Sequence, residues 1–187
     1  MQKLTASLVL AILLVSCWDL RRRPPANPGK VLGYKPVYST DSSLLRVQTM
    51  GPQPVKSAGK IYVKDNLIFQ SDIGYGIHVI DNTNPATASR IGFISLLGNS
   101  EMSVKGNYMY ANSFSDLVVI DIGDWQNVTE VKRIYKAFSQ GSAVGFYTFI
   151  PLPEHNVYYE CPDYYYYSGI QTGWVKDSVS TNSCYNP

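Results

Sequence analysis

From residue 60 onward, short apolar segments alternate with clusters of Asn, Asp, Gly and Pro. Short segments that contain Val, Ile, Tyr and Phe and are bounded by such clusters are typical of β-strands. Asn, Asp and Gly suit the intervening turns because they tolerate positive φ or cap a turn with their own side chain. The pattern predicts strands at residues 60–63, 67–70, 77–80 and 88–94.

The predicted strands belong to a segment that occurs twice in the chain. Residues 61–69 match residues 102–110 at an offset of 41, with a Val, a Lys and an Asn identical. Residues 78–81 then match residues 118–121 at an offset of 40. A period of about 40 residues accommodates four short strands and is typical of propeller blades and related β arrays. The clear repeats cover about residues 60–95 and 101–136.

The length of the chain limits the number of such units. Residues 31–187 form the expected β domain, and at about 40 residues a unit they hold at most about four units. We expect an all-β fold, a propeller-like array of four-stranded antiparallel blades that is incomplete, with two clear blades and a degenerate third. Terminal segments or another chain should cover its exposed sheet edges. The strands of the third blade would lie at residues 144–150, 157–160 and 172–175.

The N-terminal segment has the pattern of a sorting signal. A single Lys precedes an apolar run at residues 8–15, which is too short to span a bilayer as a helix. The run ends in Leu-Val-Ser-Cys at residues 14–17, which resembles the lipobox of bacterial lipoproteins. The resemblance implies that residues 1–16 are a signal peptide and that Cys17 carries fatty acid such as palmitate, with residues 17–30 as lipidated Cys and tether. The alternative is an ordinary secreted protein with a chance cysteine near its cleavage site.

Two further motifs carry a resemblance to a known family. Gly-Ile-His-Val-Ile-Asp at residues 76–81 and Asp-Leu-Val-Val-Ile-Asp at residues 116–121 resemble the LVIVD repeat, a propeller-like motif of bacterial envelope proteins. Residues 60–138 are similar to the repeat region of LVIVD-repeat lipoproteins of the Bacteroidetes type, which are longer and carry more blades. The resemblance implies a lipid-anchored protein of the bacterial cell envelope, at the outer membrane or the cell surface.

The chain contains three cysteines, so two remain once Cys17 is assigned to lipid. An even pair in an oxidising envelope compartment predicts a disulfide between Cys161 and Cys184. This bond would enclose 22 residues and restrain the C-terminal tail. The alternative is two unpaired buried thiols.

Composition and charge exclude one class of partner. Hydrophobic residues make up 45% of the chain and charged residues 16%, which is typical of a folded protein. The formal net charge of +2 arises from the N-terminal segment, because residues 31–187 contain eleven Lys or Arg and thirteen Asp or Glu. The domain therefore lacks the basic footprint of a nucleic-acid-binding protein.

Few residues are candidates for catalysis. His78 lies within a predicted strand and His155 within a predicted loop, and neither belongs to a catalytic motif. Asp81 and Asp121 recur at the ends of equivalent strands, where an acidic rim could bind a cation or a substrate. We favour a structural role, since an Asp at this place can accept a hydrogen bond from the backbone N–H two residues on. We therefore predict no catalytic residue, no metal and no cofactor.

The most distinctive segment contains six Tyr within residues 158–167. Side chains alternate between the two faces of a strand, so one buried face cannot take all of these rings. Exposed aromatic rings are common at binding surfaces for proteins or sugars. The alternative is a packing layer beneath the disulfide, or a disordered loop. The predicted binding residues are Tyr164, Tyr165, Tyr166, Tyr167 and Trp174.

Together these features favour a lipid-anchored envelope protein that displays a non-enzymatic β-repeat module for interactions. Its partners would be the membrane, through the lipid, and an unidentified protein or glycan. The alternative is a glycan-handling accessory protein or a hydrolase with a cleft at the propeller rim. A third possibility is a degenerate fragment without independent activity.

Overall fold

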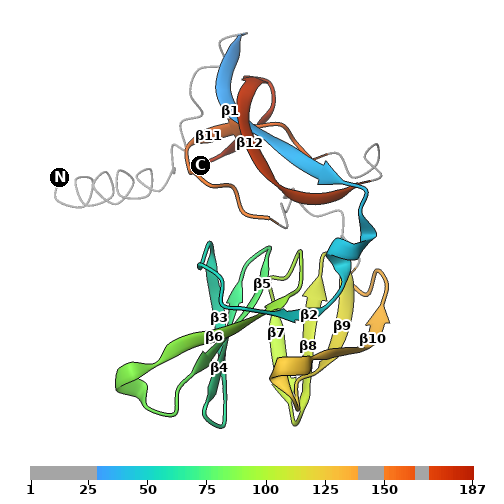
Figure 1. The fold of residues 1–187 in the computed structure, drawn as a ribbon. Coiled ribbons are helices and arrows are strands. Elements are labelled where there is room, and N and C mark those ends of the chain that lie inside the picture. Colours follow the sequence, from blue (N-terminus) through green and yellow to red (C-terminus); the bar gives the residue numbers. More distant parts are fainter. Residues whose placement is uncertain (1–28, 139–149, 163–168) are drawn as a thin grey trace, which may run out of the picture.

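The computed structural model describes residues 29–138, 150–162 and 169–187. Within these ranges the chain forms thirteen strands, three short 3₁₀ helices and no α-helix, which confirms the all-β prediction. The strands make three separate open sheets (Figure 1). Across the same ranges, no helix has the length and apolar character needed to cross a membrane.

The first sheet is antiparallel throughout and contains four consecutive strands with a fifth added at one edge. Its order is β2-β6-β5-β4-β3, so β2 covers the edge of β6. The predicted strands at residues 60–63, 67–70, 77–80 and 88–94 are confirmed as its four consecutive members. The strands are β2 (Gln48–Met50), β3 (Ala58–Lys64), β4 (Leu67–Asp72), β5 (Gly76–Asp81) and β6 (Ser89–Ser95).

The second sheet follows directly along the chain and has the corresponding antiparallel order, β10-β9-β8-β7. Both sheets contain a β-bulge at the same relative place, which leaves Ile91 in the first sheet and Val131 in the second without a direct partner. Its strands are β7 (Met102–Lys105), β8 (Tyr108–Ser113), β9 (Asp116–Asp121) and β10 (Thr129–Ile134).

The turns of the two sheets also correspond. The first hairpin turns through Asp65 at φ 52° and the second through Gly106 at φ 60°, as expected for residue types that tolerate positive φ. The N–H of Asn82 donates to the Asn66 carbonyl at 2.8 Å, and the N–H of Ile122 donates to the Asn107 carbonyl at 2.8 Å. The 40-residue offset in the sequence is therefore matched by equivalent backbone bonds.

The third sheet joins the two ends of the domain. Its order is β12-β1-β11-β13, with β1 antiparallel to β12 along its length and parallel to β11 at Tyr34 and Tyr159. It lies across one end of the other two sheets (Figure 1). Its strands are β1 (Lys30–Ser39), β11 (Val157–Tyr159), β12 (Ile170–Ser180) and β13 (Cys184–Asn186).

This sheet differs from the predicted third blade. Residues 157–160 and 172–175 do contribute to strands, but the long strand β1 lies between those strands, so the sheet is not built from consecutive strands. The physical reason is that β1 pairs with β12 along all ten of its residues and with β11 on its other side. Residues 144–149 lie outside the described residues.

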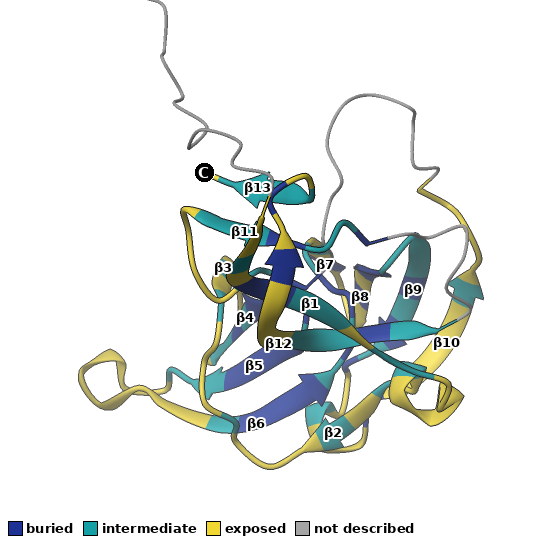
Figure 2. Cartoon of the chain, turned by 90° about the horizontal axis from the view of Figure 1, so that it is seen from above, coloured by how far each residue is buried: buried dark blue, intermediate teal, exposed yellow. Residues whose placement is uncertain are grey.

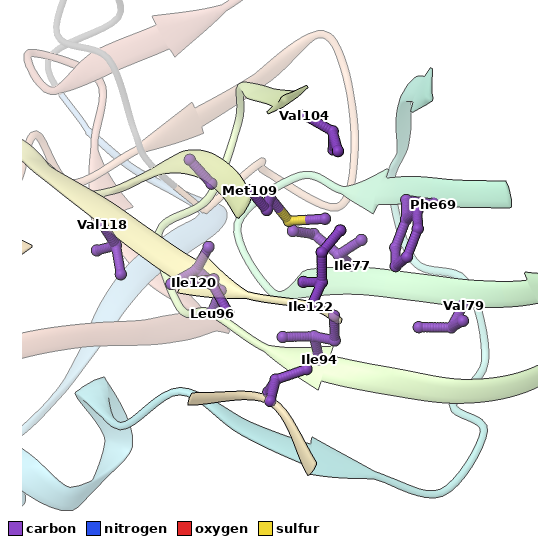
Figure 3. Close-up of a cluster of buried hydrophobic side chains, with 12 residues drawn as sticks. Phe69, Ile77, Val79, Ile94, Leu96, Val104, Met109, Val118, Ile120 and Ile122 are labelled. Atoms are coloured by element: carbon purple, nitrogen blue, oxygen red, sulfur yellow. The ribbon is translucent and has the colours of Figure 1, made fainter. Parts of the chain in front are cut away.

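The main hydrophobic core lies between the first and second sheets (Figure 3). Phe69, Ile77, Val79 and Ile94 of the first sheet are fully buried there. They pack with Met109, Val118 and Ile120 of the second sheet, which are also fully buried. The third sheet contributes no residue to this cluster.

Candidate functional site

The second sheet has one face that packs on the core and one that does not. Val104, Met109, Val118 and Ile120 point toward the first sheet and are buried. The alternating positions of the same strands point away from it. We name as the open face the residues Lys105, Tyr108, Tyr110, Leu117, Val119, Lys132 and Ile134, which the strand registers place on that other side.

The open face is accessible and mainly apolar, with Lys105 and Lys132 as its charged members. Tyr110 is 37% exposed and Ile134 is 44% exposed, whereas Leu117 and Val119 are half-buried. In Figure 2 the central strands β5 and β6 are largely dark blue, whereas the edge strand β10, which carries Lys132 and Ile134, is yellow and teal. Contiguous exposed apolar side chains on a folded domain are typical of interaction sites.

The sequence repeat explains why this exposure is unusual. Tyr110 is equivalent to Phe69, and Ile134 is equivalent to Ile94, at the offsets of 41 and 40. Both counterparts in the first sheet are fully buried, because the second sheet covers them. The side of the sheet that is core in the first sheet is therefore solvent-accessible surface in the second.

An open depression of about 560 Å³ lies at the hairpin end of the open face. The side chains of Tyr108 and Tyr110 lie on the same side of β8, and Tyr108 pairs with Asp121 on the neighbouring strand β9. Two aromatic rings thus stand beside amide, carboxylate and ammonium groups. The depression is lined by Lys105, Gly106, Asn107, Tyr108, Tyr110 and Asp121.

The strand-end aspartates have the predicted structural role. Oδ1 of Asp81 accepts the N–H of Thr83 at 2.8 Å and its hydroxyl at 2.7 Å. These bonds, the hydroxyl's above all, lower the pKa of Asp81. Oδ1 of Asp121 accepts the N–H of Gly123 at 2.8 Å, so both carboxylates fix the turn after their strand. Asp121 additionally borders the depression.

A second layer of turn bonds follows each of these aspartates. Oδ1 of Asn84 accepts the N–H of Ala86 at 3.1 Å, and Oδ1 of Asp124 accepts the N–H of Gln126 at 3.0 Å. Each bond caps a 3₁₀ helix that leads into the last strand of its sheet. These helices are η2 (Pro85–Thr87) and η3 (Trp125–Asn127), while η1 (Ser42–Leu45) connects β1 to β2.

The two histidines are not brought together. His78 is fully buried, its Nε2 lies 3.2 Å from Oδ2 of Asp72, and its ring packs on Phe93. His155 is exposed, with Nδ1 3.1 Å from the carbonyl oxygen of Pro187. The described residues contain no group of three or more His, Cys, Asp or Glu side chains placed to hold a metal ion.

The predicted disulfide between Cys161 and Cys184 is confirmed, with the two Cα atoms 5.2 Å apart. Trp174 is half-buried, since its Nε1 donates to the carbonyl of Ile150 at 2.8 Å and its ring meets that of Tyr159 edge-on at 5.6 Å. Trp174 thus has a packing role in the third sheet. The predicted sites Cys17 and Tyr164, Tyr165, Tyr166 and Tyr167 lie outside the described residues.

No protein-family model matches the chain, and neither a curated protein nor a solved structure matches it significantly. The arrangement of its own side chains therefore carries the functional argument.

Sequence reasoning missed the open face, although a signal for it was present. The repeat alignment places Tyr110 at the position of Phe69 and Val119 at the position of Val79. What the alignment alone leaves undetermined is which of the two equivalent faces another sheet covers. The pairing of the first sheet with the second answers that question.

Proposed function

We propose that this chain is a lipid-anchored protein of a bacterial cell envelope, whose propeller-like β domain is a non-enzymatic interaction module. The anchor rests on the signal-like run at residues 8–15 and on Leu-Val-Ser-Cys at residues 14–17. The resemblance of residues 60–138 to LVIVD-repeat lipoproteins supports the same compartment. A disulfide between Cys161 and Cys184 is typical of proteins in oxidising compartments.

The observation that carries the interaction role is the open face of the second sheet. Tyr108 and Tyr110 add two exposed rings to the half-buried aliphatic side chains of Leu117 and Val119. Tyr is among the residues that dominate binding energy at protein interfaces, and truncating such an anchor costs about 2 kcal/mol or more. The face thus has the composition of a protein-binding surface.

Two substitutions test the anchor and the face separately. Cys17→Ser should release the protein from the membrane fraction, because a chain with an eight-residue apolar run cannot span the bilayer. Unchanged partition into membranes and detergent would contradict the anchoring. For the face, Tyr110→Lys with Ile134→Lys should remove cross-linked neighbours in intact envelopes. The matched control Leu32→Lys alters an exposed apolar side chain on β1 and should keep those neighbours.

The tyrosine run at residues 164–167 is tested in the same cross-linking experiment with a separate variant. If Tyr165→Ala with Tyr167→Ala removes the cross-linked neighbours and the open-face variant does not, recognition belongs to the run and the open face is not the site. Thermal unfolding of each variant separates lost binding from lost fold.

A second candidate function is glycan binding in the depression beside the hairpin of β7 and β8. The specific observation is the pair of exposed rings, Tyr108 and Tyr110, next to Asn107 and Asp121. Aromatic rings and a few polar groups at fixed places are the usual lining of a ligand site. Incubation with envelope glycans distinguishes three outcomes. Retention of a glycan indicates binding, and released products indicate a hydrolase. If the protein neither retains a glycan nor releases products, glycan binding is ruled out.

A further inference from the structure

We propose that the partner of the open face is a second copy of this chain, which docks the outer face of its first sheet. This inference rests on the proposed interaction role of the open face. The outer face is the side of the first sheet that points away from the second sheet. It carries Ile61, Val63, Ile68, Gln70, His78, Ile80 and Phe93, as the strand registers require.

The contact between the two sheets of one chain is the template for the contact between copies. In that contact the first sheet presents Phe69 and Ile94, and the second sheet presents Val104 and Ile120. The open face repeats the first set as Tyr110 and Ile134. Repeating the second set requires a sheet with apolar residues at positions equivalent to Val104 and Ile120.

The first sheet provides those residues in Val63, which is exposed, and Ile80, which is half-buried. Val63 is equivalent to Val104, yet Val63 is 57% exposed and Val104 is 7% exposed. Ile61, which is 61% exposed, is equivalent to Met102. Ile80 is half-buried at the position equivalent to the fully buried Ile120. Each chain thus exposes Tyr110 and Ile134 on the open face and Ile61 and Val63 on the outer face. The docked copy covers this exposed end of the outer face, because His78 and Phe93 at the other end are already buried within the chain.

Side-chain size is compensated where the two contacts differ. Within the chain, the ring of Trp125 lies over Gly92, where an added Cβ would be 2.5 Å from a ring carbon. In the contact between copies, Lys132 stands at the position of Gly92 and Pro85 at the position of Trp125. Lys132, which is larger than Gly92, thus meets Pro85, whose ring is smaller than that of Trp125.

Charge is complementary as well. The ammonium of Lys60 on β3 pairs with the carboxylate of Glu101, and these two residues occupy equivalent positions 41 apart. Between copies, Glu101 takes the place of Lys60 and the second copy's Lys60 takes the place of Glu101. Opposite charges meet again, which favours this register more than it adds affinity.

The resulting interface is of the heterologous type, because two different surfaces meet. Such contacts close into rings when the rotation allows and otherwise form filaments. Two copies would provide four sheets of the repeated kind, two from each chain, and about four blades is the smallest number in closed propellers. The third sheet lies across the ends of the other two sheets, so it does not occupy the open face in Figure 1. We therefore infer a two-copy ring.

The association should be reversible. Asn82 and Ala88 stand at the positions of Ile122 and Val128, which are core residues of the internal contact. The contact between copies is therefore more polar than its template. Rapid exchange of chains between rings follows from that difference.

Native mass spectrometry of the full chain, purified in detergent over a concentration series, tests the proposal. The wild type and the Leu32→Lys control should show two chains. An outer-face variant, Ile61→Lys with Val63→Lys, and an open-face variant, Tyr110→Lys with Ile134→Lys, should each need at least tenfold more protein to associate. An equimolar mixture of the two variants should recover association, because one of its two contacts joins two unmodified faces.

A cross-link provides a second measurement that does not depend on the stability of the lysine variants. Mixing a Lys60→Cys chain with a Glu101→Cys chain should give the mixed disulfide-linked pair in clear excess over the two like pairs, whereas random oxidation of exposed thiols gives all three pairs in statistical proportion. A wild type that stays monomeric without this cross-link overturns the proposal. If the open-face variant still loses its envelope neighbours in that case, the proposed function stands and the partner is a different protein.

Discussion

Asp72 and His78 form a buried pair on the outer face of the first sheet, with Oδ2 of the carboxylate 3.2 Å from Nε2 of the ring. The carboxylate also accepts the backbone N–H of Lys56 at 3.1 Å and that of Ser57 at 2.5 Å. Asp72 thus fixes the segment that enters β3. The pairing gives the carboxylate and the imidazole a partner at a buried place, where an unpaired polar group would cost free energy.

The second sheet performs the corresponding task with an amide. Oδ1 of Asn112 accepts the N–H of Ser100 at 2.9 Å and that of Glu101 at 2.8 Å. Its Nδ2 donates to the carbonyl of Gly98 at 3.1 Å. An uncharged side chain can therefore anchor the segment that enters the first strand of a sheet.

This comparison yields a graded prediction for Asp72. Asp72→Ala should lower the free energy of unfolding by about 2–3 kcal/mol, because two backbone N–H groups lose their acceptor and the buried His78 ring loses its partner. Asp72→Asn should cost less, since its amide oxygen can still accept those N–H groups as that of Asn112 does. Urea unfolding of both variants measures the difference. Equal losses for Ala and Asn would show that the negative charge is the essential property.

The disulfide gives a prediction for the third sheet. Cys161→Ser with Cys184→Ser should lower the free energy of unfolding by about 3 kcal/mol, as expected when a loop of this length is no longer closed in the unfolded chain. Tyr159 of β11 pairs directly with Cys184 of β13. In the variant without the disulfide, these two short strands should therefore exchange their amide hydrogens faster than in the wild type. Hydrogen exchange that is unchanged in both strands would contradict the prediction.

Glu154 gives a prediction on pH. Its Oε1 accepts a hydrogen bond from the Tyr34 hydroxyl at 2.7 Å and one from the Lys176 ammonium at 3.0 Å. These contacts, that of Tyr34 first, lower the pKa of Glu154. A depressed carboxyl pKa adds stability that is present above the pKa of the unfolded chain and is lost as the pH falls through the folded-state pKa.

Tyr34→Phe should therefore raise the pKa of Glu154 toward its ordinary value and flatten the dependence of stability on pH in the acid range. Titration of the Glu154 carboxyl carbon by NMR measures the first effect, and urea unfolding at several pH values measures the second. Lys176→Met is the matched control that removes the other donor and should act in the same direction. A pKa that stays depressed in both variants would contradict this account.

The fold could be predicted where the information is local. Alternating apolar and turn-forming residues located β3 to β6, and the Asp that ends a strand predicted the turn bonds at Asp81 and Asp121. The cysteine count predicted the disulfide. Each of these features depends on neighbours in sequence or on the parity of a small number of residues.

The rest depends on partners far along the chain. Tyr34 on β1 aligns with Tyr159 on β11, and no periodicity in either segment specifies a parallel pairing over such a separation. The open face was likewise not predicted, because Phe69 and Tyr110 occupy equivalent places in equivalent strands. Only the packing of one sheet on the other makes the first residue core and the second residue surface.

Phe69 and Tyr110 therefore form a matched pair for the last prediction. Phe69→Ala should lower the free energy of unfolding by about 3–5 kcal/mol, since it removes a fully buried ring from the core between the sheets. Tyr110→Ala should cost less than about 1 kcal/mol, because its exposed ring gives up little buried area in the single chain.

The effects of these variants on association should be reversed. Tyr110→Ala should weaken the self-association measured by native mass spectrometry, because its ring becomes buried only when a second chain covers the open face. Tyr110→Phe should keep association near the wild-type level, since the ring and not the hydroxyl fills the position that Phe69 fills in the internal contact. A Tyr110→Ala chain that loses stability as Phe69→Ala does, at a concentration where the wild type is monomeric, would show that Tyr110 is already part of the core of one chain.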